Sequence, residues 1–418
     1  MNLGTATVLR ANARALPIPD DSVDLIVTSP PYFALRSYTD AGEHYAGQIG
    51  DEPTPAEFLD SLLAVTRECM RVLKPSGSLW VNLGDKYSDR AGPEWAGSSD
   101  RLTGRPPKPR RQSSTAMAPR KSLLGLPWRY ALACIDNLGL ILREEIIWSK
   151  PNGLPESVTD RVRRSHEHWF HLTLNPHYFS AVDEIREQHA PVSVKRAASH
   201  RSPAGRRDSE VYSAMPGQTL QLDQSLHPLG RLPGSVWTIS TEPLAVPSEL
   251  GIDHFAAFPT EWPKRIIQGW SPSGVCTACG EGRRPVTSTT HEQYRAAGST
   301  GRPKNQALVG NHQGGRNGVG YPQTVSRTSI DSYACACPEP TAPTTPAVVL
   351  DLFGGTGTTA MVAKALGRHG ISVDMSADYC RLAQWRTTDR NQLAKVLGVA
   401  KTEKPDDHQL DLFAEEPA

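Results

Sequence analysis

The stretch Thr28-Ser29-Pro30-Pro31-Tyr32 constrains the fold of this chain more than any other. It follows the apolar residues Val23, Leu25, Ile26 and Val27, which have the composition of a buried strand. Each proline ring fixes φ at about −65° and removes a backbone N–H, so the strand must end here in a stiff turn. Ligands of open α/β sheets bind at this carboxyl edge. The Ser29 hydroxyl, the Pro30 carbonyl and the Tyr32 ring would then form a pocket for a planar amine.

A glycine-rich stretch, residues 351–359, follows a second apolar run at residues 348–350. Glycines at 354, 355 and 357 allow the backbone to approach a ligand closely. The pattern from Thr358 to Leu366 predicts a helix directly after the turn. Nucleotide-binding folds of several kinds share such a turn, so the two motifs in this order carry more information than either alone.

Together the two motifs resemble those of the amino-group DNA methyltransferases, whose catalytic signature is Ser/Asn/Asp-Pro-Pro-Tyr/Phe. The resemblance implies catalytic roles for Ser29, Pro30, Pro31 and Tyr32, and it identifies the ligand of the glycine-rich turn as S-adenosylmethionine. The residues expected at the cofactor are Asp351, Phe353, Gly354, Gly355, Thr356, Gly357, Thr358, Asp374, Phe258 and Thr260. Asp374 ends a predicted strand, a position from which dinucleotide folds bind ribose hydroxyls. Phe258 would line the methionine end of the cofactor, and packing as plain core is its alternative.

The catalytic motif precedes the cofactor motif, which is the order of the β class of this family. The resemblance therefore implies a Rossmann-like α/β fold, circularly permuted, with a seven-stranded and mostly parallel sheet. Both chain ends would build it: residues 1–185 form the catalytic half and residues 346–397 the cofactor half. The other expected segments are part of a target-recognition region (186–233), a lead-in to the cofactor site (234–272), a Cys-rich insertion (273–345) and a flexible tail (398–418).

Local patterns predict the surrounding elements. Thr54 is suited to cap a helix from about Pro55 to Leu73, with Glu57 completing a capping box. Strands are expected at residues 5–10, 78–83 and 140–148, and a second helix at about 128–138. Asp85 faces the pocket if the sheet is parallel, and a simple turn aspartate is the alternative.

Serine at the first motif position favours cytosine N4 as the methylated atom, and adenine N6 is the alternative. The target base must leave the duplex to reach Tyr32. More distant alternatives are an RNA or protein methyltransferase and a non-catalytic, zinc-containing DNA-binding protein. The order of the motifs and a local basic segment favour DNA over RNA and protein.

A basic loop within residues 86–121 is the expected contact to double-stranded DNA. The whole chain has 45 Lys+Arg against 44 Asp+Glu, so a nucleic-acid surface must be local. Seven positive charges and no acid lie between 101 and 121, which suits a phosphate clamp, while a solvated disordered insert is the alternative. The seven residues are Arg101, Arg105, Lys108, Arg110, Arg111, Arg120 and Lys121.

Four cysteines of the insertion, at 276, 279, 335 and 337, suit a closed tetrahedral zinc site, with free thiols as the alternative. These metal-ligand candidates are Cys276, Cys279, Cys335 and Cys337. Three histidines at 166, 168 and 171 also invite a metal interpretation, but the resemblance makes their segment a pocket wall.

The tail contains a short apolar peptide, Gln409, Leu410, Asp411, Leu412 and Phe413, that resembles the segment by which bacterial proteins dock on the DNA sliding clamp. An accidental apolar end is the alternative. No apolar run approaches the roughly 20 residues of a membrane span, and the N-terminus lacks a signal pattern. We therefore expect a soluble, cytoplasmic protein without a membrane partner.

Overall fold

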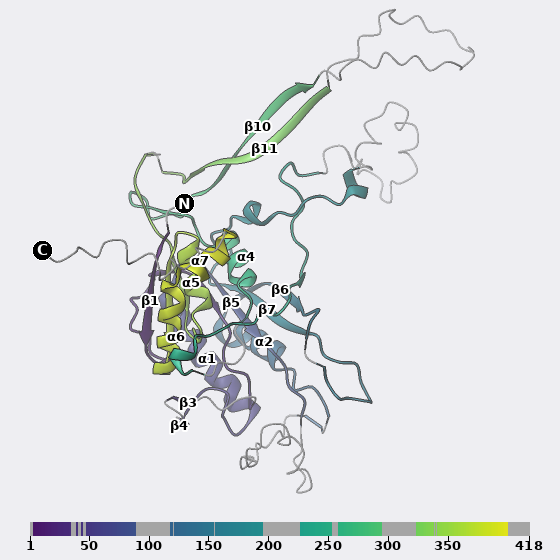
Figure 1. Ribbon diagram of the computed structural model, residues 1–418, viewed down its shortest axis with the longest axis vertical. Coiled ribbons are helices and arrows are strands. Elements are labelled where there is room, and N and C mark those ends of the chain that lie inside the picture. Colours follow the sequence, from purple (N-terminus) through teal and green to yellow (C-terminus); the bar gives the residue numbers. More distant parts are fainter. Residues whose placement is uncertain are drawn as a thin grey trace, which may run out of the picture. The chain divides into compact units, whose positions relative to one another are not determined.

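In the computed structural model of this chain, an eight-stranded mixed sheet organises the larger of two units (Figure 1). Across the sheet the strands are β1 (Thr5–Arg10), β14 (His369–Asp374), β13 (Val348–Asp351), β2 (Val23–Thr28), β5 (Leu73–Leu83), β7 (His166–Thr173), β6 (Ile141–Ser149) and β8 (Val236–Thr238). Strand β7 is antiparallel to both of its neighbours, and the other neighbouring pairs are parallel. The expected parallel-rich α/β sheet is confirmed.

The structure describes a defined part of the chain. The described residues are 3–34, 39–40, 43–44, 47–88, 118–119, 121–153, 155–194, 226–252, 258–294, 323–337, 339 and 341–399. The larger unit comprises residues 1–185, 234–284 and 335–418, and the second comprises 186–233 and 285–334. The sliding-clamp peptide and six of the seven basic-loop residues lie outside the described residues, so both contacts stay predictions.

Within the described residues the sheet has eight strands, where seven were expected, so the predicted strand count was wrong. The additional strand, β8, pairs with β6 at the sheet edge, where Trp148 lies opposite Trp237. Three residues are too few to display the alternation by which a strand is recognised in sequence.

The two ends of the chain meet in the middle of the sheet. Strand β13 pairs with β2, and Leu350 lies opposite Ile26. All six residues of β2 are buried, as expected for a central strand of a sheet covered on both faces. This pairing brings the end of the first motif's strand beside the start of the glycine-rich turn.

Helices cover both faces of the sheet. Within the described residues, the helices of the larger unit are α1 (Pro55–Val72), α2 (Leu126–Leu138), α4 (Glu261–Trp270), α5 (Thr358–Ala365), α6 (Ala377–Thr388) and α7 (Arg390–Leu397). One core joins Ile26 of β2 to α1 and α2, and the other joins Leu25 and Val27 to α4, α5 and α7. Because successive strand residues point to opposite faces, β2 contributes to both cores.

Helix α1 begins where the sequence predicts. Thr54 Oγ1 accepts a hydrogen bond of 3.2 Å from the Glu57 N–H, and Pro55 is the first helical residue. Proline suits this position because its missing N–H would have no partner within the helix.

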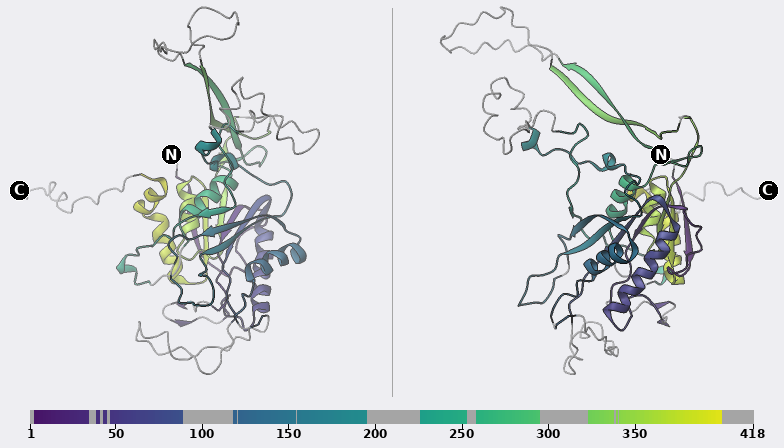
Figure 2. Two further views of the ribbon diagram at one scale, coloured as in Figure 1. Left: turned by 90° about the vertical axis from the view of Figure 1, so that its right-hand side faces the viewer. Right: turned by 180° about the vertical axis from the view of Figure 1, so that it is seen from behind.

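Smaller elements complete the two units. In the larger unit these are β3 (Thr39–Asp40), β4 (Glu43–His44), η1 (Val182–Ile185), η5 (Ser248–Leu250), β9 (Val275–Cys276) and β12 (Thr344–Thr345). Two long strands, β10 (Arg284–Tyr294) and β11 (Gln323–Ala334), form a two-stranded ribbon (Figure 2). No helix in the described ranges combines the length and apolar character needed to cross a membrane.

Candidate active site

The catalytic turn leaves the sheet at the end of β2. Thr28 is the last residue of the strand and is buried, and Ser29 and Tyr32 are half-buried beyond it. Within the described part of the chain, neither Ser29 Oγ nor the Pro30 carbonyl oxygen has a hydrogen-bond partner.

A polar network fixes the Tyr32 ring. The Tyr32 hydroxyl donates to Glu167 Oε2 at 2.8 Å, and Asn82 Nδ2 donates to both the Tyr32 oxygen (3.1 Å) and Glu167 Oε2 (3.0 Å). Lys150 Nζ donates to the other oxygen of Glu167. Three strands, β5, β6 and β7, thus provide or border the groups that hold the phenol end of the ring. The aromatic face that would receive a base has a defined orientation.

Gly84 packs directly against the same ring. A Cβ at this position would lie 2.6 Å from Tyr32 Cε2, closer than real Cβ contacts occur. The absence of a side chain at Gly84 therefore allows the ring to occupy its place beside the end of β5.

The next residue, Asp85, is a helix cap. Its carboxylate accepts hydrogen bonds from the N–H groups of Gly125 (2.9 Å) and Leu126 (3.1 Å) at the start of α2. Because helix N-termini carry unpaired donors and a partial positive charge, this contact stabilises the helix. Of the two readings of Asp85, the structure supports a structural aspartate.

Asp351 is the buried first residue of the glycine-rich stretch. Its Oδ1 accepts from the hydroxyl of Thr28 (2.7 Å) and the N–H of Phe353 (3.1 Å), and its Oδ2 accepts from the hydroxyl of Thr359 (2.9 Å). Burial raises the pKa of Asp351 to about 6, while the bonds from Thr28 and Thr359 oppose the rise. With 1% of its surface exposed, Asp351 acts on the shape of the turn.

Glycine is required at two positions of this turn for different reasons. A Cβ at Gly354 would lie 1.9 Å from Ser372 Oγ of β14. Gly357 has φ +73°, a conformation that L side chains rarely adopt, and a Cβ there would lie 2.8 Å from Ala383 of α6. The turn is therefore pressed against β14 and α6 and presents backbone on its open side.

A buried arginine lies behind the turn. Arg386 Nη1 donates to the hydroxyls of Thr356 (2.8 Å) and Thr358 (2.5 Å), and the side chain is 3% exposed. Burial lowers the pKa of Arg386 to about 10, opposed by the charge of Glu242. These contacts fasten the turn to α6.

The remaining cofactor candidates flank the turn. Asp374 Oδ2 accepts from the Gly355 N–H at 2.9 Å, at the end of β14 where the sequence places it. Thr260 donates from both its N–H and its hydroxyl to Glu242 Oε2, each at 2.8 Å. Phe258 packs edge-on against Trp169 with ring centroids 5.7 Å apart, and it borders the second core. Phe353 is partly buried against the first core.

Two of the three histidines of β7 have ordinary hydrogen-bond partners. His171 is buried and bonded to Ser78 Oγ at 3.0 Å, and burial lowers its pKa to about 3. His168 Nδ1 contacts Glu145 Oε1 at 2.6 Å. Among the described residues, only the four cysteines form a group close enough to hold a metal ion.

The cysteine group is assembled from two chain segments. The sulfur atoms of Cys276, Cys279, Cys335 and Cys337 all lie within 4.8 Å of one another, and all four thiols are free. The N–H groups of Cys279 and Ala278 donate to Cys276 and lower the pKa of its thiol to about 6.

Lys121 is the one basic-loop candidate that the structure describes. Its Nζ lies 2.6 Å from Asp160 Oδ2, with both side chains largely exposed. An exposed ion pair of this kind contributes little to stability, and the contact of Lys121 with DNA stays a prediction.

Four residues at the site were not identified from sequence: Asn82, Lys150, Glu167 and Arg386. Lys150 and Asn82 each lie at or near the carboxyl end of a predicted strand, which is a usable signal. Glu167 is near the start of an antiparallel strand, whose pairing no sequence pattern specified. Arg386 looks like a surface residue of a helix that ends in polar residues.

The Ser-Pro-Pro-Tyr turn and the glycine-rich turn follow two adjacent strands, β2 and β13. Known proteins with this pair of motifs identify the family. The sequence profile of the family described as DNA methylase (N6/N4) matches residues 23–276 and 341–385, which is more than half of the chain. The chain belongs to the N6/N4 DNA methylase family. Both motifs of this DNA methylase lie inside the matched residues, whereas Cys279, Cys335 and Cys337 lie in the unmatched segment between them.

Individual relatives agree with the family. This DNA methylase is 34% identical over 268 residues to the type II methyltransferase M.Cfr9I of Citrobacter freundii, which covers 62% of this chain and 71% of the relative. It is 39% identical over 188 residues to the type II methyltransferase M.SmaI of Serratia marcescens, covering 44% of this chain and 62% of the relative.

Among solved structures, the PvuII DNA methyltransferase, described as cytosine-N4-specific, has a TM-score of 0.50 and 17% identity. It covers 95% of this chain and 92% of its own. This likeness concerns the fold alone.

Proposed function

We propose that this DNA methylase transfers a methyl group from S-adenosylmethionine to the exocyclic amine of a base in double-stranded DNA, with cytosine N4 as the favoured target. The observation that carries the proposal is the pairing of β2 with β13, which brings the acceptors of Ser29 and Pro30 and the ring of Tyr32 beside the glycine-rich turn. A base site and a cofactor site on neighbouring strands suit direct transfer between two bound molecules.

The residues around the glycine-rich turn fit the cofactor. The space that a Cβ would fill at Gly354 and Gly357 is taken by β14 and α6, so the turn offers backbone to a ligand. Asp374 stands at the carboxyl end of β14, where dinucleotide folds hold ribose hydroxyls. When bound, S-adenosylmethionine supplies a methyl group attached to a positively charged sulfur.

The catalytic turn prepares the amine. An exocyclic amine is a poor nucleophile because its lone pair is conjugated with the ring. Ser29 Oγ and the Pro30 carbonyl oxygen accept hydrogen bonds from its two N–H groups. These contacts favour a pyramidal nitrogen with a more available lone pair. The Tyr32 ring packs on the flipped base, offsetting part of the roughly few kcal/mol that unstacking costs. No covalent enzyme intermediate is needed.

Serine at the first motif position favours cytosine N4 over adenine N6. Adenine N6 is the second candidate because the family profile includes both chemistries. The two relatives are named type II methyltransferases, and we place this chain in the same restriction–modification setting.

Nucleoside analysis tests the choice of base. Unmethylated DNA is incubated with the protein and S-adenosylmethionine carrying a deuterated methyl group, then digested to nucleosides and examined by mass spectrometry. We expect labelled N4-methylcytosine, formed much more slowly with Ser29→Ala and with Tyr32→Ala. Labelled N6-methyladenine would replace the favoured target by the second candidate. Labelled RNA or protein, with unlabelled DNA, would contradict the proposal.

A further inference from the structure

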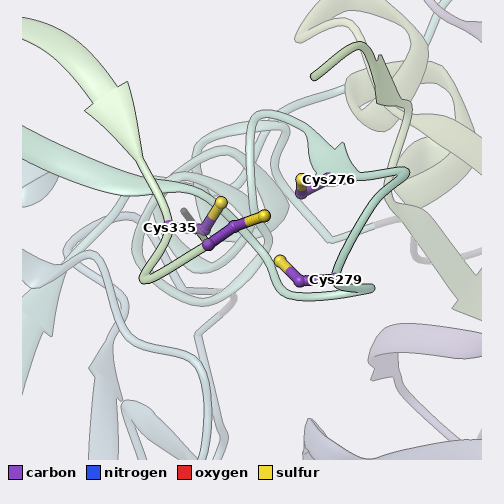
Figure 3. A group of neighbouring side chains, drawn as sticks. Cys276, Cys279 and Cys335 are labelled. Atoms are coloured by element: carbon purple, nitrogen blue, oxygen red, sulfur yellow. The ribbon is translucent and has the colours of Figure 1, made fainter. Parts of the chain in front are cut away.

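Four thiols converge in the larger unit at the point where the chain enters and leaves the β10–β11 ribbon. Cys276 and Cys279 lie shortly before β10, and Cys335 and Cys337 directly follow β11. Figure 3 shows the side chains of Cys276, Cys279 and Cys335 around one space. Three of the four lie outside the residues that the DNA methylase profile matches.

The geometry is that of a tetrahedral metal site. Zn–S bonds of about 2.3 Å in a tetrahedron place the sulfur atoms about 3.8 Å apart. The observed set, with all four sulfur atoms within 4.8 Å of one another, contracts to that arrangement by small side-chain movements. Four sulfur ligands without nitrogen or oxygen donors select zinc or iron among common metals, and leave no open position for a substrate.

The first pair of ligands is held in a tight turn before any metal binds. The Cys276 N–H donates to the Glu281 carbonyl (2.9 Å), and the Gly280 N–H donates to the Cys276 carbonyl (2.9 Å). Gly280 has φ +73°, which favours glycine at this position. The turn is also pinned to the returning chain, because Thr277 donates to the Pro343 carbonyl from both its N–H (3.0 Å) and its hydroxyl (2.9 Å).

We propose that these four cysteines bind one structural zinc ion. The ion links the chain segment before β10 to the segment after β11. A two-stranded ribbon on its own is only marginally stable in water, and within the described residues this sheet has two strands with mostly exposed side chains. A metal bound to folded but not to unfolded chain contributes its binding free energy to folding. The ion therefore stabilises the start of the ribbon and does not take part in methyl transfer.

Metal analysis of the full-length protein is the direct test. The protein is purified without a metal-chelating column, dialysed against metal-free buffer and measured by mass spectrometry for zinc and iron. We expect about one equivalent of zinc per protein chain. A mercurial reagent should release this zinc in proportion to its reaction with the four thiols. Cobalt substitution should give the sulfur-to-cobalt charge-transfer band and intense visible bands of a tetrahedral site.

Serine variants assign the ligands. Cys279→Ser and Cys337→Ser should each retain less than about a fifth of the zinc, whereas Cys380→Ser, a cysteine of α6, should keep it. Amide exchange should rise in residues 284–294 and 323–334 on zinc removal, with the β2 and β13 amides unchanged. This readout and the zinc measurement are independent of methyl transfer, so failure of the proposed function would not affect them.

Three results would overturn the proposal. These are less than about half an equivalent of zinc in the wild-type protein, iron in its place, or unchanged zinc in both serine variants. The wild-type titration decides the question even if a serine variant fails to fold.

Discussion

Thr28 Oγ1 donates a hydrogen bond of 2.7 Å to Asp351 Oδ1, across 323 positions of the chain. Thr28 precedes the catalytic turn and Asp351 begins the glycine-rich turn, so this bond joins the two motifs inside the sheet. Both residues are buried, with 3% and 1% of their surface exposed. The geometry of transfer between the two proposed sites therefore depends on a contact that neither substrate reaches.

Asp351→Asn tests the buried bond through its pH dependence. The pKa of Asp351 is raised to about 6 in the folded chain, against about 3.9 for an unfolded aspartate. Between these values the folded chain binds more protons, so the contribution of this group to stability rises as pH falls. Relative to Asp351→Asn, the wild-type protein should gain about 1 kcal/mol of unfolding free energy between about pH 7.5 and pH 5. Denaturant unfolding at both pH values measures it, and a gain on the alkaline side would contradict the assignment.

Gly354→Ala tests the packing of the glycine-rich turn. The new methyl group would lie 1.9 Å from Ser372 Oγ, so the turn must move away from β14. We expect S-adenosylmethionine to bind at least about tenfold more weakly, a loss of about 1.4 kcal/mol, by calorimetry. Adding Ser372→Ala removes the hydroxyl and should restore part of the affinity. Equal affinities for wild-type protein and Gly354→Ala would show that the ligand does not use this turn.

Gly84→Ala tests the placement of the Tyr32 ring. A Cβ at Gly84 would lie 2.6 Å from Tyr32 Cε2 and push the ring out of its position. We expect methyl transfer to fall by about tenfold or more, with S-adenosylmethionine binding unchanged, because about 1.4 kcal/mol of lost positioning is a factor of ten. Gly234→Ala is the matched control, since no atom lies within 4 Å of its added Cβ. Equal rates of methyl transfer for Gly84→Ala and Gly234→Ala would show that the position of the Tyr32 ring does not matter for transfer.

The Tyr32–Glu167 pair calls for a double-variant cycle. Tyr32→Phe keeps the ring but loses the donor to Glu167, and Glu167→Gln weakens the acceptor that also pairs with Lys150. Each change should lower kcat by about tenfold, and the double variant should be no slower than the slower single variant within about threefold, because both remove the same contact. Losses that multiply would mean that Glu167 acts independently of the ring.

Sequence patterns predicted the parts of the fold that depend on local chemistry. Helix α1 begins at Thr54 and Pro55 as expected, and Asp374 ends β14 beside the glycine-rich turn. The resemblance to a known family predicted the sheet, because the two motifs determine which strands are central.

Contacts between strands that are distant in the sequence could not be predicted from local patterns. Glu167 meets Tyr32 only because β7 runs antiparallel between β5 and β6, and no pattern in one strand specifies its neighbours. Arg386 is buried and donates hydrogen bonds to two threonine hydroxyls, although arginine in a polar helix usually faces solvent. Strand β8 was also missed, because its three residues are too few to be recognised as a strand.

Single-turnover methyl transfer to unmethylated DNA, measured together with S-adenosylmethionine binding, tests the central claim most directly. The wild-type protein should transfer tritium from labelled cofactor to DNA. Ser29→Ala should bind the cofactor within about twofold of wild type yet transfer at least about tenfold more slowly, because one acceptor of the amine is lost. Full transfer by Ser29→Ala, or tight cofactor binding by the wild-type protein without transfer to DNA, would contradict the account.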